Sequence, residues 1–310
     1  MNWTGVMPAM TTPFDADLAV DHAFLAQHAS WLLANGCSGL VMLGSLGEGA
    51  TLEHHEKIAI LKTAVSVAGK APVVAAISAL STAHAVQLAK EAEAVGCQAL
   101  MVLPPYVYAS DWYEMKQHVA AVIAATPLSC MLYNNPVAYK TDFLPEQIAE
   151  LAAEHCNLHA VKESSTDVRR VAAIRAILGD RLSICVGVDD VIVEGIHAGA
   201  VGWVAGLVNA YPAESVLLFH LAKEGKTEEA FELYRWFLPL LRMDTVPKFV
   251  QLIKWVQEQA GVGSARVRGP RLELAGDDLA TAKATFAIAL RDRVAIAEKP
   301  FATFAATVGA

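Results

Sequence analysis

Short apolar runs alternate with helical stretches along most of the chain, and this alternation restricts the possible folds more than any other feature. Eight such runs occur, and they are Gly5–Thr12, Gly39–Gly44, Pro72–Ser78, Ala99–Pro104, Leu128–Asn134, Leu158–Ser164, Ser183–Asp189 and Gly202–Leu207. Most of them lack a regular alternation of apolar and polar residues, which is typical of parallel strands that are buried on both faces. Segments with apolar residues at helical spacing lie between the runs, for example Ala23–Asn35, His54–Ala68, Thr82–Val95, Asp111–Ala125 and Pro145–Glu154. This order of elements predicts parallel strands joined by crossover helices.

Eight strand–helix units predict a (β/α)8 TIM barrel over residues 1–210. The alternative is an open, doubly wound sheet, but its nucleotide-binding form carries a glycine fingerprint after the first strand. Here that strand ends Thr11-Thr12-Pro13-Phe14, without such glycines. Residues 211–295 carry helical patterns only, which predicts the last barrel helix followed by a C-terminal helical appendage. The tail, residues 296–310, has no clear periodicity, and we expect it to be partly disordered.

The composition excludes several classes of partner. The formal net charge is −8, and Lys and Arg do not cluster, so no nucleic-acid surface is expected. No stretch approaches the roughly 18–20 apolar residues of a membrane span, and no secretory signal is recognisable. The five cysteines are widely spaced and form no CxxC pair, which indicates reduced thiols in a cytoplasmic protein and no zinc site. We therefore assign no metal, and we expect a small-molecule partner.

A lysine stands at the end of the sixth apolar run, directly after the β-branched Val161. The C-terminal ends of barrel strands converge on one face, where catalytic groups gather. An amine that is partly buried there loses solvation, which would lower its pKa and let it attack a carbonyl carbon to form a Schiff base. The alternative interpretation of Lys162 is an amine that extends to solvent.

Three further polar side chains fall at the ends of other predicted strands. Ser45 lies in the glycine-rich turn Gly44–Gly49, Tyr106 follows the fourth run, and Tyr133 lies in the fifth. The turn matches neither phosphate-binding glycine pattern, but its exposed N–H groups and hydroxyl suit a small carboxylate. A tyrosine phenol can transfer protons when its neighbours tune it. Together with Lys162, these residues predict covalent imine chemistry on a carbonyl substrate.

The seventh and eighth runs complete the predicted mouth of the barrel. Gly187 and Gly206 are expected to let a ligand approach the backbone. We expect Gly187 and Val204 to contribute to substrate binding. Asp189 and Asp190 are interpreted as caps of the following helix rather than as acids.

Four motifs, in order along residues 1–295, resemble those of the dihydrodipicolinate synthase / N-acetylneuraminate lyase family of class I aldolases and dehydratases. They are the opening Gly5–Phe14, the turn Gly44-Ser45-Leu46-Gly47-Glu48, the segment Tyr133-Asn134-Asn135-Pro136 and the segment Val161-Lys162-Glu163-Ser164. The resemblance implies that Lys162 forms an imine with a 2-oxo acid, commonly pyruvate, and that Tyr133 relays protons. It further implies that Ser45 and the backbone N–H of Leu46 hold the carboxylate of the 2-oxo acid. It also implies a homotetramer, built as a dimer of dimers, that needs no cofactor.

The chain departs from this family where the second substrate would bind. Members that make dihydrodipicolinate carry an arginine two residues after the motif proline, and this chain has Ala138 there, followed by Tyr139-Lys140. Without that arginine an aldehyde acid would lose a bidentate anchor, which a lysine cannot reproduce geometrically. We interpret Lys140 as a solvated side chain.

Two more departures concern hydroxyl groups. Leu46 replaces a second hydroxyl of the family turn. Family members usually show two adjacent tyrosines after the fourth strand, and Val107 holds the second of these places. Tyr106 or Tyr108 could therefore only partly substitute for the missing tyrosine.

The sequence thus predicts a Schiff-base-forming lyase that acts on a 2-oxo acid through Lys162. It would be a pyruvate-releasing aldolase, or a dehydratase or deaminase of a hydroxylated 2-oxo acid or cyclic imine. Ala138 and Leu46 favour a hydroxylated aliphatic acid, such as one from sugar-acid or hydroxyproline breakdown. The alternatives are a 4-hydroxy-tetrahydrodipicolinate synthase that condenses pyruvate with aspartate semialdehyde, a metal-dependent aldolase, and a non-catalytic 2-oxo-acid sensor.

Overall fold

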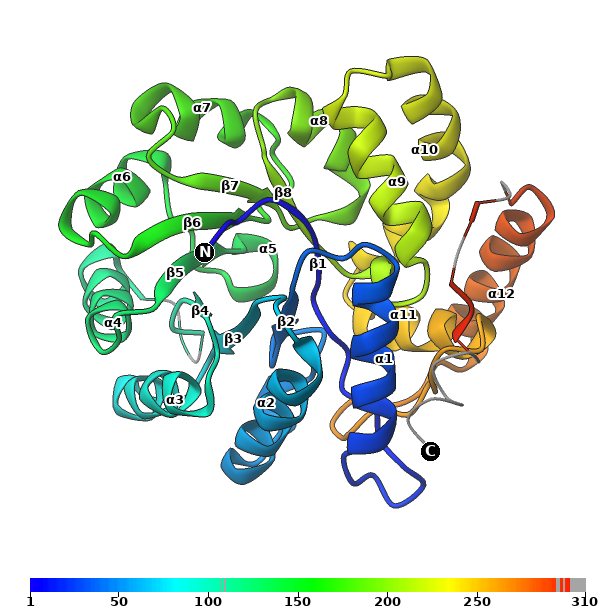
Figure 1. Ribbon diagram of the computed structural model, residues 1–310, viewed down its shortest axis with the longest axis horizontal. Coiled ribbons are helices and arrows are strands. Elements are labelled where there is room, and N and C mark those ends of the chain that lie inside the picture. The colour runs from blue at the N-terminus through cyan, green and yellow to red at the C-terminus, as the bar shows by residue number, and fades with distance from the viewer. Residues whose placement is uncertain (107, 109, 294–295, 298, 302–310) are drawn as a thin grey trace.

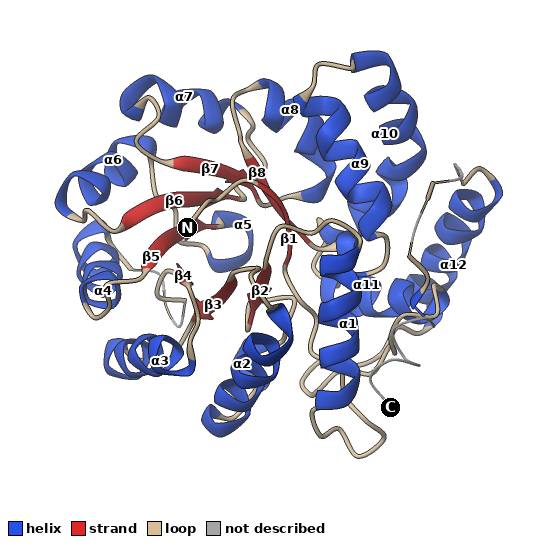
Figure 2. Ribbon diagram, viewed as in Figure 1, coloured by secondary structure: helices blue, strands red, loops and turns tan. Residues whose placement is uncertain are grey.

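Eight parallel strands form the centre of the molecule, shown in red in Figure 2. The computed structural model describes residues 1–310 except 107, 109, 294–295, 298 and 302–310. The strands are β1 (Gly5–Pro8), β2 (Leu40–Met42), β3 (Val73–Ile77), β4 (Ala99–Val102), β5 (Ser129–Asn134), β6 (Leu158–Glu163), β7 (Ser183–Val186) and β8 (Gly202–Ala205). They pair in the order β1-β8-β7-β6-β5-β4-β3-β2, and a parallel bridge between Ala9 and Val41 joins the two ends. The predicted (β/α)8 barrel is confirmed.

Helices surround this barrel (Figure 1). Those that follow the strands are α1 (His22–Ala34), α2 (His54–Ala68), α3 (Thr82–Val95), α4 (Trp112–Ala124), α5 (Pro136–Tyr139), α6 (Pro145–Glu154), α7 (Arg169–Leu178), α8 (Ile192–His197) and α9 (Pro212–Lys223). The appendage, which Figure 1 shows beside α9 and α1, contains α10 (Thr227–Leu241), α11 (Phe249–Gln259) and α12 (Gly276–Arg291). Short 3-10 turns are η1 (Gly49–Thr51), η2 (Asp189–Val191), η3 (Leu207–Asn209) and η4 (Arg242–Asp244). The described helices therefore extend the barrel with one helical layer on a single side.

Polar caps fix the starts of several barrel helices. The side chain of Asp21 accepts a hydrogen bond from the N–H of Phe24, and Ser81 and Asp111 do the same for α3 and α4. Such caps satisfy backbone donors that have no partner within the helix. The helices consequently begin within a residue of the positions that the sequence pattern predicts.

Part of the predicted tail packs on α1. The indole nitrogen of Trp31 donates a hydrogen bond of 2.6 Å to the carbonyl oxygen of Lys299. The ring of Phe301 stands edge-on to the Trp31 ring, with 5.4 Å between the centroids. Residues 302–310, which the sequence analysis expected to be partly disordered, lie outside the described residues.

A buried ion pair joins the barrel to the appendage. Lys254 on α11 is 2 % exposed, and its Nζ lies 2.9 Å from Oε1 of Glu48, whose side chain is fully buried. The same Nζ donates to the carbonyl oxygen of Thr12 at 2.9 Å, and the N–H of Arg268 donates to Glu48 Oε2 at 3.0 Å. Because both charges are hydrogen-bonded as well as paired, the burial cost of each is offset.

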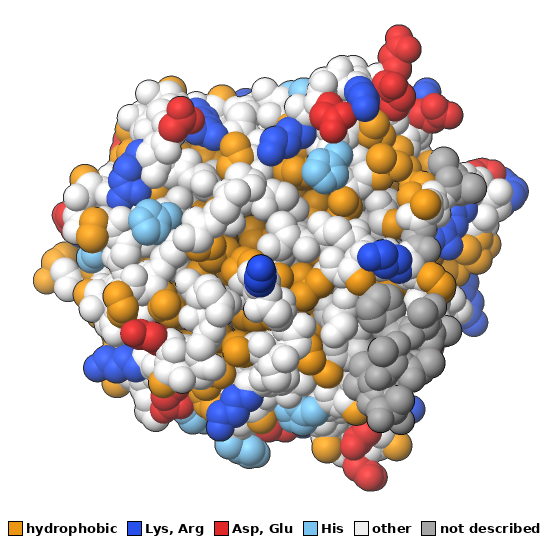
Figure 3. Space-filling view, viewed as in Figure 1, with side chains coloured by type: hydrophobic (Ala, Val, Ile, Leu, Met, Phe, Trp, Pro, Cys, Tyr) orange, Lys and Arg blue, Asp and Glu red, His pale blue; other side chains and the backbone are white. Residues whose placement is uncertain are grey.

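Figure 3 shows the distribution of charged side chains over one face of the molecule. Lys and Arg side chains are scattered over this face and do not gather into a patch. No helix among the described residues is long and apolar enough to cross a membrane.

A buried histidine links α1 to the end of β8. His28 is fully buried, and its Nε2 lies 2.8 Å from the carbonyl oxygen of Asn209, to which it donates. Burial lowers the pKa of His28 to about 4, and the hydrogen bond to the backbone only partly opposes this. The folded state therefore holds His28 neutral under conditions in which the unfolded chain would protonate it.

This gives a stability prediction. Between pH 6.5 and 4 the unfolded state binds the His28 proton and the folded state does not, so stability falls as the pH falls. We expect His28 to contribute a loss of about 2 kcal/mol in the free energy of unfolding between pH 7 and pH 5, which is the part of the pH slope in urea denaturation that depends on this residue. His28→Gln should flatten this slope, and the exposed control His84→Gln should leave it unchanged. An equal slope in wild type and His28→Gln would contradict the assignment.

Candidate active site

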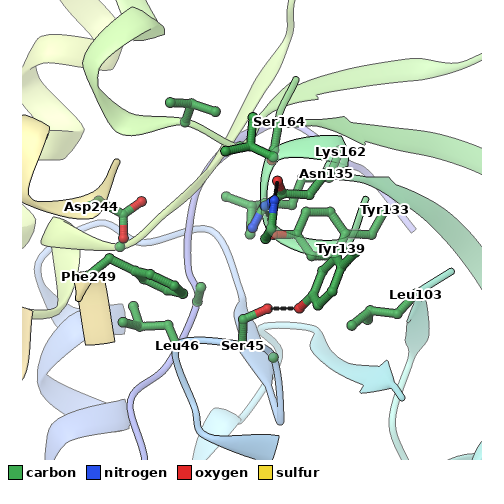
Figure 4. A pocket seen from close by; sticks show the side chains of 18 of the residues that line it. Ser45, Leu46, Leu103, Tyr133, Asn135, Tyr139, Lys162, Ser164, Asp244 and Phe249 are labelled. Atoms are coloured by element: carbon green, nitrogen blue, oxygen red, sulfur yellow. Dashed lines mark hydrogen bonds between the residues drawn. The ribbon is translucent and has the colours of Figure 1, made fainter. Parts of the chain in front are cut away.

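All seven residues that the sequence predicts for the site line one cavity of about 570 Å³. They are Ser45, Leu46, Tyr106, Tyr133, Lys162, Gly187 and Val204. They lie near or beyond the C-terminal ends of β2, β4, β5, β6, β7 and β8, which the barrel brings to one face. Figure 4 shows the arrangement of the cavity side chains, with Lys162, Tyr133 and Tyr139 close together on one side.

Lys162 and Tyr133 are neighbours because of the strand register. They are Cα partners across the parallel pair β5–β6, so both side chains point to the same face of the sheet. The Lys162 Nζ lies 4.4 Å from the centroid of the Tyr133 ring, and both residues are buried. Asn135 Nδ2 donates a hydrogen bond of 2.9 Å to the Tyr133 hydroxyl, which orients the phenol. An amine and a phenol thus meet at the cavity wall, an arrangement that suits imine formation with proton transfer.

Gly187 makes room for the lysine side chain. A Cβ atom at this position would lie 2.0 Å from Ser164 Oγ and 2.5 Å from Lys162 Cε. The space where a side chain would stand at Gly187 is therefore occupied by Ser164 and Lys162. This is a packing reason for glycine that the sequence alone did not reveal.

The turn after β2 is compact and leaves two backbone donors available. Gly49 approaches the Leu43 carbonyl oxygen so closely that a Cβ would lie 2.1 Å from it, and Gly47 is similarly close to Met10. The N–H groups of Glu48 and Gly49 bond within the turn. Among the described residues, no acceptor bonds to the N–H of Ser45 or Leu46. These two donors and the Ser45 hydroxyl suit the carboxylate of a 2-oxo acid.

Tyr139 is a site residue that the sequence analysis missed. It ends the short helix α5, which Asn135 caps, and its hydroxyl forms a hydrogen bond with Ser45 Oγ (Figure 4). Its ring stands edge-on to Tyr133, with centroids 5.9 Å apart, and lies 5.8 Å from the Tyr106 ring. Burial raises the pKa of Tyr139. The only signal in the sequence was its position three residues after the motif proline.

The predicted tyrosine loop contributes one residue to the cavity. Tyr106 lines the cavity, its hydroxyl bonds to Ser78, and burial raises its pKa. Tyr108 is 55 % exposed, and Val107 lies outside the described residues. Lys140, interpreted as solvated, is exposed and does not line the cavity.

The interpretation of Asp189 as a cap of the following helix is wrong. Asp189 lies in η2 and is fully buried, and its carboxylate accepts hydrogen bonds from Trp203 Nε1 and from the N–H groups of Gly206 and Leu207. These donors belong to β8 and the turn after it. The Asp189 carboxylate therefore bonds to groups of the neighbouring strand instead of the N–H groups at the start of the following helix. Burial raises the pKa of Asp189, and these hydrogen bonds oppose that rise.

The appendage supplies a second wall of the cavity. Its lining residues are Asp244, Thr245, Val246, Pro247, Phe249 and Arg271. The sequence analysis identified none of them, because nothing local marks a helical segment that folds back over a barrel mouth. Among the residues that the structure describes, no group of three or more His, Cys, Asp or Glu side chains is placed to hold a metal ion.

Comparison with known proteins agrees with this geometry. Residues 2–289 match the model of the dihydrodipicolinate synthetase family. The 4-hydroxy-tetrahydrodipicolinate synthase of Desulforamulus reducens is 30 % identical over 279 residues, which cover 90 % of this chain and 94 % of that protein. The enzyme of the same name from Xanthomonas axonopodis pv. citri is 35 % identical over 232 residues, covering 74 % and 76 % of the two chains.

Solved structures are similar over almost the full length. The 4-hydroxy-tetrahydrodipicolinate synthase of Methylacidiphilum fumariolicum SolV superposes with a TM-score of 0.89 at 26 % identity, covering 99 % of both chains. The chloride-inhibited dihydrodipicolinate synthase of Acinetobacter baumannii, complexed with pyruvate, gives a TM-score of 0.87 at 26 % identity and covers 93 % and 99 %.

The packing at Gly187 generates a prediction. Gly187→Ala forces the Lys162 side chain to shift, and a displacement of about 1 Å in a reacting group can cost about 10²-fold in rate. We expect a loss of that order in the rate at which a pyruvate adduct is trapped by borohydride, followed by mass spectrometry. The double variant Ser164→Ala/Gly187→Ala removes the closer clash and should recover part of the rate. A wild-type rate in Gly187→Ala would show that the lysine is not constrained there.

The bond between Ser45 and Tyr139 generates another prediction. Tyr139→Phe removes the hydroxyl that bonds to Ser45 and should lower kcat by about 10²-fold if this pair conducts protons. Tyr106→Phe removes a hydroxyl that bonds to Ser78 instead, and we expect a smaller loss. Steady-state kinetics of the two variants across pH make the comparison. A larger loss in Tyr106→Phe would assign the proton transfer to the tyrosine loop.

Proposed function

The chain belongs to the dihydrodipicolinate synthetase family, whose members are Schiff-base-forming, lyase-type enzymes, and we propose that this member acts on a hydroxylated 2-oxo acid or cyclic imine. Its product would be pyruvate from an aldol cleavage, or a dehydrated or deaminated 2-oxo acid. The observation that carries the proposal is the buried Lys162 amine, which faces a cavity and lies against the Tyr133 ring.

In the proposed reaction, Lys162 Nζ attacks the C2 carbonyl of the substrate, and loss of water gives an iminium. In an aldol cleavage, Tyr133 takes the proton of the C4 hydroxyl as the C3–C4 bond breaks, and the electron pair forms an enamine at C2–C3. Tyr133 returns the proton to C3, and hydrolysis releases pyruvate and restores the amine. Ser45 and the N–H of Leu46 hold the carboxylate throughout, with the charge of Arg271 nearby, since Arg271 interacts electrostatically with Tyr139.

The residue at position 138 favours this substrate class over aspartate semialdehyde. Ala138 is exposed on α5 and offers no charge to a second carboxylate. The relatives described above carry the name of the condensing enzyme, so condensation of pyruvate with aspartate semialdehyde is the second candidate. A coupled assay with both compounds decides between them, because robust turnover would overturn the interpretation of Ala138.

A non-catalytic sensor of 2-oxo acids is the candidate from another class. A sensor needs groups that bind the carboxylate of the ligand, but it needs no nucleophile. The pairing of Lys162 with Tyr133 therefore argues against a sensor. Such a protein would gain thermal stability with pyruvate and yield no product with any of the proposed substrates.

We further propose a cytoplasmic homotetramer. The cysteines of the described residues are all unpaired and four of the five are buried, which supports a reducing compartment. Leu80, Tyr108 and Tyr113 are exposed on the adjacent segments around α3 and α4, and an apolar surface of this kind supports contact between subunits.

The central prediction concerns Lys162. Incubation with pyruvate followed by borohydride reduction should give one adduct per chain, which peptide mapping places at Lys162. Lys162→Ala should lose both the adduct and turnover on a panel of hydroxylated 2-oxo acids and cyclic imines. The matched control Lys140→Ala, an exposed lysine near the same cavity, should keep both. No adduct under saturating pyruvate in the wild-type enzyme would exclude the imine mechanism.

A further inference from the structure

Apart from the charge of Arg271, the appendage wall of the cavity has no role in the chemistry proposed above. It presents one carboxyl group, that of Asp244 in η4, beside the apolar side chains of Val246, Pro247 and Phe249. Figure 4 shows Asp244 across the cavity from Tyr139, with Phe249 and Leu46 next to it. The strand ends supply the reacting groups, so this wall is the part of the cavity that is left to recognise the remainder of the substrate.

The Asp244 carboxyl lies directly over the end of β8. A Cβ atom on Gly206 would lie 2.1 Å from Asp244 Oδ1, so only glycine at this position allows the carboxyl to lie there. The N–H of Gly206 also donates to the Asp189 carboxylate, so the carboxyl groups of Asp189 and Asp244 both lie against Gly206. No hydrogen-bond donor among the described residues reaches the Asp244 carboxyl. The group is therefore held in place by packing and is available to a ligand.

The neighbouring charges determine which form of the carboxyl faces the cavity. Burial raises the pKa of Asp244 well above its usual range, and the negative charges of Asp189 and Asp190 raise it further, whereas the Lys162 charge lowers it. Asp189 has three hydrogen-bond donors to stabilise its charge, and Asp190 lies 3.7 Å from Arg242. Because two adjacent buried carboxyls do not both ionise readily, these surroundings favour the neutral form of Asp244. Asp244 then offers one O–H donor and one acceptor.

Three tyrosine rings occupy one wall of the cavity. The centroid of the Tyr139 ring lies 5.8 Å from that of Tyr106 and 5.9 Å from that of Tyr133. Ser45, which bonds to the Tyr139 hydroxyl, lies on the same side of the cavity. A substrate attached to Lys162, with its carboxylate at Ser45, can extend along the opposite wall, where Asp244 lies. A second carboxylate there would come close to the negative charges of Asp189 and Asp190, and like-charge repulsion disfavours it.

We propose that Asp244 determines specificity by hydrogen-bonding a hydroxyl group, or the nitrogen of a cyclic imine, on the part of the substrate beyond the imine carbon. This inference rests on the proposed function and sharpens it, because it selects a short aliphatic 2-oxo acid with a neutral polar substituent. In this arrangement the apolar side chains next to Asp244 contact the carbon chain of the substrate, and the Asp244 carboxyl hydrogen-bonds the substituent on that chain. A site that hydrogen-bonds a substituent discriminates strongly against the analogue that lacks it, because its polar group is left unpaired.

The test uses two ligands that differ by a single hydroxyl, 4-hydroxy-2-oxopentanoate and 2-oxopentanoate. Binding to the wild-type enzyme is measured from the concentration dependence of the borohydride-trapped adduct, and we expect a preference of about 10- to 100-fold for the hydroxylated ligand. Asp244→Ala should abolish this preference, and Asp244→Asn, which keeps the shape and a donor, should keep part of it. Asp190→Asn removes a neighbouring carboxylate that does not line the cavity and should keep the full preference.

The outcomes separate this inference from the proposed function. If wild-type enzyme forms no adduct with pyruvate, the proposed function fails, whatever the variants do. If adducts form but Asp244→Ala and Asp244→Asn keep the wild-type preference, only the inference about Asp244 is overturned. If Asp244→Ala does not fold, Asp244→Asn alone decides, since an unchanged ratio there together with equal pH dependence would overturn the proposal.

Discussion

The ion pair between Glu48 and Lys254 is the constraint on which the rest of the site depends. Glu48 ends the turn that carries Ser45, and Lys254 belongs to a helix that begins some two hundred residues later. Neither charge reaches solvent, and the pair also engages backbone groups of Thr12 and Arg268. Removing one partner of such a pair typically costs about 3–5 kcal/mol, because the other charge is left uncompensated. The turn that carries Ser45 and Leu46 is therefore held in a fixed position relative to α11 of the appendage.

Two parts of the chain, the barrel and the appendage, line the cavity. The barrel strands provide Lys162 and Tyr133, which are brought together by strand register alone. The segment from η4 to α11 provides Asp244 and Phe249, which line the opposite wall of the cavity. Under the proposals made above, chemistry and selectivity then depend on different secondary-structure elements of one cavity.

The sequence predicts the parts of this protein that depend on local pattern. The eight strands, the helices between them and Lys162 follow from apolar periodicity and from the rule that barrel strands end at one face. Contacts between distant segments are not predictable in this way. Asp189 looks like a helix cap in the sequence, but it binds the neighbouring strand, and Tyr139 reaches Ser45 only because a four-residue helix turns back into the cavity. Nothing in the sequence near Asp244 indicates that it faces Lys162.

The bond between Ser45 and Tyr139 has a consequence for how such a protein can change over evolutionary time. Both residues come from the same polypeptide, so this bond forms within one chain. Residues at a contact between copies of the chain are not needed to make this bond. Their substitution can alter the mode of assembly while Ser45 and Tyr139 stay bonded, so this bond can persist among descendants that assemble differently.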